Sequence, residues 1–271
     1  MNNYSVKKPL LPVKSDFIFK LIFGDQRNVD ILAEFLKPIL RIPDDEYEQL
    51  TIVDPHVKRE SLKDKSAILD VKVHTKSGNV IHVEIQVCKF PEMVERTLFY
   101  QSKMITEQIK SGEDWHLIKR TVNIIITDFE FVSKSDKYHN RFRYTNEDGV
   151  VLTDLTEINT LELRKLPVDS DNTELWNWLK FIKTDSEEEM DMLAEKSVQF
   201  SKAVGFLKEL SADERTRMLY EERENARRDV VSMVRGAVID VARNLISAGA
   251  SLDLIAQATK LSNKEIEELM R

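Results

Sequence analysis

The 271-residue chain has little cysteine, glycine or proline. Its single cysteine, Cys88, excludes an internal disulfide framework and a cysteine-rich zinc module, and it suits a reducing compartment. Seven glycines and seven prolines leave little room for long low-complexity linkers. The N-terminus has no apolar stretch typical of a signal peptide, and the run VNIIIT from Val122 is far too short to cross a bilayer. We therefore expect a soluble, cytoplasmic protein without a membrane partner.

The signatures of several enzyme classes are also missing. The sequence has no glycine-rich phosphate loop, no HExxH metal motif and no GxSxG elbow. The five histidines are scattered, and only His74 and His82 could meet across a hairpin to share a zinc ion. A net charge of -7 argues against coating nucleic acid by bulk electrostatics. Because most of the excess negative charge lies in the C-terminal half, the N-terminal half can still carry a local basic groove.

The residues that are present favour an α/β protein. Hydrophobic residues make up 42% of the chain and charged residues 32%, enough for a core beneath a highly charged surface. Apolar spacing predicts two short helices at 16–40, strands at 50–58, 68–74 and 80–87, a helix at 91–111 ending at Gly112, and a buried strand at 120–129. This order predicts a compact unit that ends near residue 131. Two later strand-like runs flank NEDG at 146–149 and suggest an antiparallel extension or a small cap.

From Thr173 onward the pattern becomes helical, so we divide the chain into an α/β domain at 1–165 and a helical region at 166–271. A long charged helix ends at Gly249, and Ser251 and Ser262 are suited to cap two short final helices. These two helices resemble a helix-turn-helix element, but the second carries Glu265, Glu267 and Glu268, which DNA phosphates would repel. We expect this element to serve docking or oligomerisation.

The predicted hairpin at 68–87 has one apolar face and one polar face, because side chains alternate along a strand. Its polar face comprises Asp70, Lys72, His74, His82, Glu84 and Gln86. If the loop is Lys76-Ser77-Gly78 with Gly78 in the left-handed position, Asp70 lies opposite Glu84. A loop shifted to 77–79 would instead pair Asp70 with Gln86 and Lys72 with Glu84. We favour the first register, because glycine is best used at the third loop position.

Two opposed carboxylates repel one another, and a purely structural sheet gains nothing from them. A hard divalent cation between them turns this repulsion into a net attraction, since Mg²⁺ and Mn²⁺ take carboxylate oxygens and water as ligands. Such an ion can polarise a phosphodiester and lower the pKa of a bound water. An ordinary solvated polar face is the alternative that the spacing leaves open.

Four segments, taken in order, resemble the recombination-promoting nuclease and transposase family of the PD-(D/E)XK nuclease superfamily. They are DFIFKLIFGDQRNVDILAEFL at 16–36, LDVKVHTKSGNVIHVEIQV at 69–87, ERTLFYQSKMITEQIKSGEDW at 95–115, and VNIIIT. The likeness covers about residues 14–130. It implies a restriction-endonuclease-like core, a mixed sheet flanked by helices, followed here by a mainly helical C-terminal region.

The resemblance also implies a catalytic site. Asp70, Glu84 and the backbone carbonyl of Ile85 would bind Mg²⁺, with Mn²⁺ as a substitute. Gln86 stands where the superfamily usually has lysine, and an amide can only hydrogen-bond where an ammonium also supplies charge. Lys72, on the same face, is a candidate for the missing positive charge.

Three further residues could contact a phosphate or brace the site, namely Arg96, Tyr100 and Lys20. Asp16 is expected to cap a helix and Glu34 to lie at the surface. The implied function is a bacterial metal-dependent DNA endonuclease in recombination or a transposon-like element. The alternative is a weak or inactive nuclease fold that binds DNA or protein, with a homo-oligomer or partner engaged through the C-terminal helices.

Overall fold

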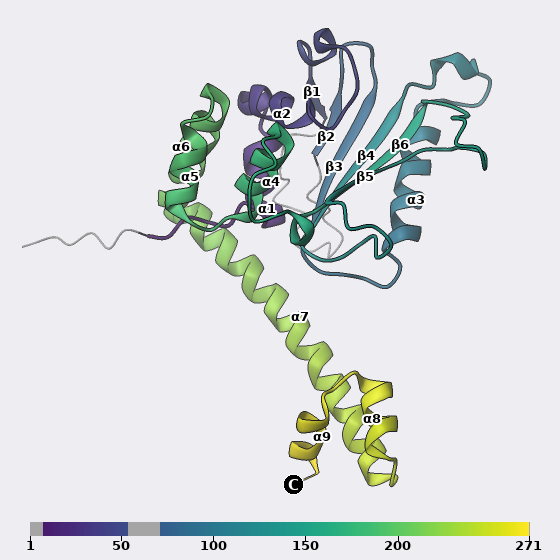
Figure 1. Cartoon of the computed structure of the whole chain (residues 1–271), viewed down its shortest axis with the longest axis vertical. Coiled ribbons are helices and arrows are strands. Elements are labelled where there is room, and N and C mark those ends of the chain that lie inside the picture. Colours follow the sequence, from purple (N-terminus) through teal and green to yellow (C-terminus); the bar gives the residue numbers. More distant parts are fainter. Residues whose placement is uncertain (1–7, 54–70, 271) are drawn as a thin grey trace, which may run out of the picture. The chain divides into compact units, whose positions relative to one another are not determined.

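The computed structural model describes residues 8–53 and 71–270, so Asp70 lies outside the described residues. The chain divides into two compact units, Met1–Asp213 and Glu214–Arg271, and each is considered by itself. The described part of the first unit contains a mixed six-stranded sheet in the order β1-β2-β3-β4-β6-β5 (Figure 1). Its strands are β1 Thr51–Val53, β2 Val71–His74, β3 Val80–Gln86, β4 Thr121–Thr127, β5 His139–Phe142 and β6 Thr156–Glu162.

The sheet combines an antiparallel half with a parallel centre. Strands β1, β2 and β3 are antiparallel neighbours, β4 runs parallel to both β3 and β6, and β5 is an antiparallel edge. Every residue of β4 is buried, as its β-branched sequence predicts. The later strands were expected to form an extension or cap, and that is only partly right. β6 lies inside the sheet beside β4, and only β5 extends it.

Helices cover both faces of this sheet (Figure 1). On one face lies α3, Met93–Thr106; the other helices of the unit are α1 Asp16–Phe23, α2 Val29–Leu36, α4 Glu174–Lys183, α5 Glu187–Ala194 and α6 Val198–Ala212. Gln101 of α3 donates to Thr156 of β6, whereas Gly24, just after α1, lies against Val71 of β2 on the opposite face. The fold is therefore the predicted mixed sheet flanked by helices.

Two predicted helix ends are wrong in detail. The helix α3 stops at Thr106, and Gly112 forms a later turn with φ +89° rather than capping the helix. Ser15, not Asp16, occupies the N-cap position of α1, and Asp16 accepts a 2.6 Å hydrogen bond from the backbone N–H of Phe17. The expected break at Gly24 between α1 and α2 is confirmed.

An aromatic core joins α4 and α6 to the N-terminal helices. Trp178 stacks on Phe200 with ring centroids 4.1 Å apart, and it meets Phe23 and Phe35 edge-on. Each such buried ring contributes about 1.5–3 kcal/mol relative to exposure. This packing carries the first compact unit to Asp213, so the predicted division at residue 165 does not coincide with the boundary between the units.

The second unit consists of α7 Glu214–Ser247, α8 Leu252–Thr259 and α9 Asn263–Leu269. Its small core centres on Ala242, Ile255 and Ile266. Ser251 and Ser262 cap α8 and α9 as predicted, and Ser262 forms a capping box with Glu265. Among the described residues, no helix is long and apolar enough to cross a membrane.

Candidate active site

The β2–β3 hairpin adopts the favoured register. Lys72 lies opposite His82 and His74 lies opposite Val80, so the alternative that opposes Lys72 to Glu84 is wrong. Gly78 has φ +87°, the left-handed conformation that the three-residue loop requires. The backbone N–H of Thr75 donates to the carbonyl of Asn79 at 3.0 Å and closes the loop.

Glu46 braces this loop from a short 3-10 helix, Asp44–Tyr47. Its carboxylate accepts hydrogen bonds from the Thr75 hydroxyl and from the backbone and hydroxyl of Ser77, at 3.2 and 2.8 Å for the latter two. The Thr75 hydrogen bond is the main reason that the pKa of Glu46 lies below its ordinary value. Sequence reasoning missed Glu46, because nothing in PDDEY indicates a contact with a loop about thirty residues away.

Glu84 projects from β3 toward α3 and is only 3% exposed. The Gln86 amide donates to its Oε1 atom, and the Arg96 guanidinium donates to the same oxygen at 3.1 Å. Arg96 also lies over the ring of Tyr100, 5.6 Å from its centroid. The structure thus brings together four of the predicted site residues, with a guanidinium offsetting the charge of a carboxylate removed from water.

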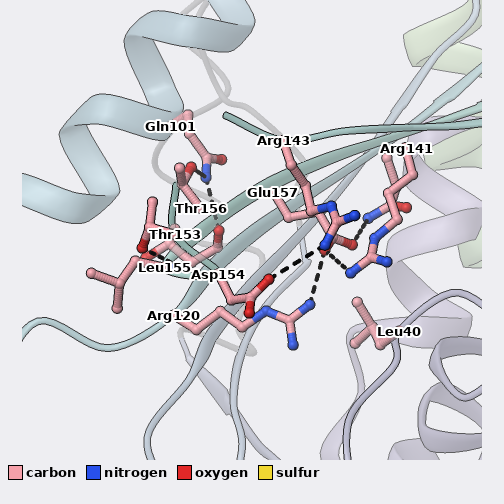
Figure 2. A network of polar contacts seen from close by, with 12 residues as sticks. Leu40, Gln101, Arg120, Arg141, Arg143, Thr153, Asp154, Leu155, Thr156 and Glu157 are labelled. Carbon is pink, nitrogen blue, oxygen red and sulfur yellow. Dashed lines mark hydrogen bonds and ion pairs between the residues drawn. The ribbon is translucent and has the colours of Figure 1, made fainter. Parts of the chain in front are cut away.

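The position of α3 is fixed by a second amide, Gln101. Its Nε2 atom donates to the carbonyl of Thr121 and to the hydroxyl of Thr156, both at 2.8 Å (Figure 2). Gln101 is buried, so these bonds are shielded from competing water. They attach α3 to β4 and β6, and this attachment holds Arg96 and Tyr100 over the sheet.

His82 lies beside Glu84 on the same face, 7% exposed, with Nδ1 at 3.1 Å from the Asn123 side-chain oxygen. Burial, together with the charge of Lys72, lowers the pKa of His74. Within residues 8–53 and 71–270, no group of three or more His, Cys, Asp and Glu side chains could hold a metal ion. The shared zinc site considered for His74 and His82 therefore finds no support.

Three predicted residues remain, namely Lys72, Lys20 and Ile85, whose backbone carbonyl, next to Glu84 in the chain, is the expected ligand. The Lys72 ammonium is 3.9 Å from Glu107, beside a depression of about 160 Å³ that Tyr100 also lines. Lys20 lies in the last turn of α1, against Gly24 and thus on the Val71 side of the sheet. Ile85 points into the apolar face of β3, where it is paired with Ile126.

Two acidic residues have ordinary surroundings. Glu34 forms a surface ion pair with Lys37 at 2.5 Å, as expected for a surface residue. Asp128, which follows β4, pairs with Lys14 at 3.4 Å. Neither is joined to Glu84 by an ion pair in the described part of the chain, so Glu84 is the carboxylate around which this site is built.

Comparison with known families matches residues 13–237 to the PD-(D/E)XK nuclease family transposases. The chain belongs to this family. The resemblance predicted from four short segments is confirmed, and the match extends well beyond residue 130. No curated protein and no solved structure gives a significant match. As a PD-(D/E)XK nuclease family transposase, the protein has a nuclease-type fold, and nucleases of this kind generally use divalent metal ions.

Proposed function

We propose that the protein is a metal-dependent DNA endonuclease that hydrolyses phosphodiester bonds. The observation that carries the proposal is the cluster that Glu84 and Gln86 of β3 form with Arg96 of α3, in a chain of this nuclease family. The observed register also supports it. It is the register in which the sequence predicts Asp70 opposite Glu84; that pairing stays a prediction, because Asp70 lies outside the described residues.

The donor set suits a hard cation. A carboxylate from Glu84, a second from Asp70 and the backbone carbonyl of Ile85 would be oxygen ligands of the kind that Mg²⁺ prefers, with Mn²⁺ as a substitute. When bound, the ion polarises the phosphodiester and lowers the pKa of a water ligand. Among the described residues Glu84 is one of these ligands, and no group of three or more His, Cys, Asp and Glu side chains completes a metal site there.

In this proposal each residue of the site has a separate role. Glu84 would hold the cation, and Arg96 holds the Glu84 carboxylate through a charge-assisted hydrogen bond. Gln86 can orient the attacking water by hydrogen bonding but adds no charge. Lys72 lies 3.9 Å from Glu107 and Arg96 lies 3.1 Å from Glu84, so both cations have an acidic partner. Arg96 is the candidate for stabilising negative charge on the phosphate, because it contacts Glu84 itself and would lie beside a phosphate bound there.

A cleavage assay tests the function. Supercoiled and linear DNA are incubated with Mg²⁺ or Mn²⁺ and with wild type, Asp70→Ala or Glu84→Gln. Each variant should lower the cleavage rate by about a thousandfold, as loss of a group essential to the transition state does. The matched control is Glu188→Gln, an exposed glutamate of α5, which should cleave normally. Equal cleavage by Glu84→Gln and wild type would falsify the proposal.

A catalytically weak nuclease fold that binds DNA or protein is the second candidate. It is favoured by Gln86, which replaces the usual lysine. Gln86→Lys distinguishes the two, because restored charge should produce or raise cleavage in a weak enzyme. DNA binding by a wild type that shows no metal-stimulated cleavage would favour the second candidate.

The cellular setting belongs to the same proposal. We infer a cytoplasmic bacterial protein that acts on DNA in recombination or mobile-element movement. The family supports this, as one of transposases. The exposed apolar side chains of α7, Val230, Val234 and Val241, support a homo-oligomer or a partner protein bound through the C-terminal helices. Light scattering on the full chain measures which of these forms.

A further inference from the structure

A cavity of about 410 Å³ opens on the face of the sheet opposite Glu84. It lies beside the edge strand β5 and is also lined by residues of the segment after α2. Arg41, Lys137, His139 and Arg141 line it, with Asn140 among the neutral residues. Its lining contains no Asp or Glu from the described part of the chain, although the whole chain carries a net charge of -7.

Arg141, in one wall of the cavity, is held in place by hydrogen bonding to Glu157. Glu157 of β6, 2% exposed, accepts hydrogen bonds from Arg141 and, at 2.9 Å, from Arg120 (Figure 2). Asn159 donates to its other oxygen at 2.8 Å. Burial acts to raise the pKa of Glu157, but the bonds from Arg141 and Asn159 and the charge of Arg120 outweigh it, so the pKa lies below its ordinary value. Two guanidinium groups share one carboxylate, which leaves a net positive charge here.

The other cationic groups are available to a ligand. Arg41 and Lys137 are exposed, and neither side chain makes an ion pair with any residue at 8–53 or 71–270. His139 is fixed by its Nε2 atom, 2.9 Å from the Asn159 side-chain oxygen. The cavity therefore combines the held guanidinium of Arg141, a planar group that can donate to two oxygens of a phosphate, with two exposed cations.

We propose that this cavity binds a phosphate group of a nucleic-acid strand, distant from the bond that is cut. Its volume falls in the range of roughly 300–1,000 Å³ that holds small ligands, enough for a phosphate with part of its sugar. A chain with net negative charge needs such a local basic site to hold DNA. The position opposite Glu84 means that the bound segment is not the one at the catalytic carboxylate. The proposal rests on the proposed function in taking nucleic acid as the substrate.

Binding without cleavage tests the proposal. Fluorescence anisotropy of short fluorescein-labelled single-stranded and duplex DNA is measured in EDTA, with salt varied. The test variant is Arg41→Gln/Lys137→Gln, and the matched control is Arg164→Gln/Lys196→Gln, which removes the same charge from exposed positions outside the cavity. The test variant should bind about tenfold more weakly, and the slope of log K against log salt should shrink by about one to two.

The control variant should bind within about twofold of wild type, since bulk charge acts weakly at a distance in salt. Equal weakening in both variants would overturn the inference, because it would assign the effect to net charge alone. A separate measurement with inorganic phosphate alone distinguishes binding of free phosphate from binding of nucleic acid. If phosphate raises the melting temperature of wild type and not of the test variant, while DNA affinity is the same in both, the cavity binds free phosphate and the nucleic-acid proposal fails.

These outcomes are separable from failure of the nuclease proposal. Loss of cleavage in Glu84→Gln combined with equal DNA binding in both double variants would leave the nuclease intact and remove this inference. Weakened DNA binding in the test variant alone, with no cleavage by wild type, would support the phosphate site and contradict the nuclease proposal.

Discussion

The two faces of the sheet each bury a glutamate beside arginine, but the two glutamates are bound differently. Glu157 is 2% exposed, and its arginine partners Arg120 and Arg141 have side chains only 16% and 18% exposed. Glu84 is 3% exposed, yet Arg96 is 32% exposed and contacts it through one amino group. Glu157 accepts hydrogen bonds at both carboxylate oxygens, from Arg120, Arg141 and Asn159, whereas Arg96, one partner of Glu84, is partly exposed to solvent. Burial of a carboxylate therefore does not by itself distinguish the two glutamates; the exposure of their arginine partners does.

The sharpest test of this comparison replaces each glutamate by glutamine. Glu157→Gln should lower the free energy of unfolding by about 3 kcal/mol, because two buried guanidinium groups lose their counter-charge. Glu84→Gln should lower it by less than about 1 kcal/mol, since Arg96 can turn toward water. Urea denaturation followed by circular dichroism measures both values. Equal losses would contradict the distinction between an enclosed and an accessible carboxylate.

The contrast also explains what could be predicted from sequence. Strand alternation and the position of Gly78 fixed the hairpin register and the face that carries Glu84, because both are local properties. The partners of Glu157 could not be found in this way. Arg120 directly precedes β4, while Arg141 and Glu157 belong to β5 and β6, so their meeting depends on tertiary strand pairing. The sequence TEINTLE does not alternate cleanly.

Other differences between the sequence-based predictions and the structure also arise from tertiary packing. The Trp176/Leu179/Ile182 pattern predicts a helix correctly, but helical spacing does not say that Trp178 will stack on Phe200. Hence the boundary between the compact units at Asp213 was missed. Similarly, the sequence predicts that Arg96 and Tyr100 contact a phosphate or brace the site, while the hydrogen bond from Arg96 to Glu84 depends on the packing of α3 against β3.

A second test concerns the accessible partner. Arg96→Gln should lower the DNA cleavage rate by about a hundredfold, because a single charged donor at a reacting group is worth about that much. Some loss of stability is also expected, because the buried Glu84 carboxylate loses the guanidinium that offsets its charge. Arg164→Gln, at an exposed position, is the control. Rates are measured under single-turnover conditions, and an unchanged rate in Arg96→Gln would restrict Arg96 to a structural contact.

Acid should affect the enclosed glutamate in a defined direction. Because the pKa of Glu157 is lowered on folding, its stabilising contribution is present above the ordinary glutamate pKa of 4.5 and is lost as pH falls through the lower folded value. Glu157→Gln should therefore make the unfolding free energy less dependent on pH in this acidic range. Denaturation at a series of pH values measures this. A slope equal to that of wild type would show that other carboxylates control acid unfolding.

The smallest expected effect is at the loop that sets the register of the candidate site. Glu46→Ala removes the acceptor for Thr75 and Ser77 and should cost about 1 kcal/mol of unfolding free energy, the net worth of about one hydrogen bond. Glu48→Ala is the matched control, because Glu48 makes only a 3.9 Å surface contact with Lys76 and should be nearly neutral. Faster amide hydrogen exchange at Thr75 and Ser77 in Glu46→Ala alone would localise the effect to the loop. If the DNA cleavage rate of Glu46→Ala falls together with its stability, Glu46 also helps to position Glu84, which lies nine residues after Thr75 in the same hairpin.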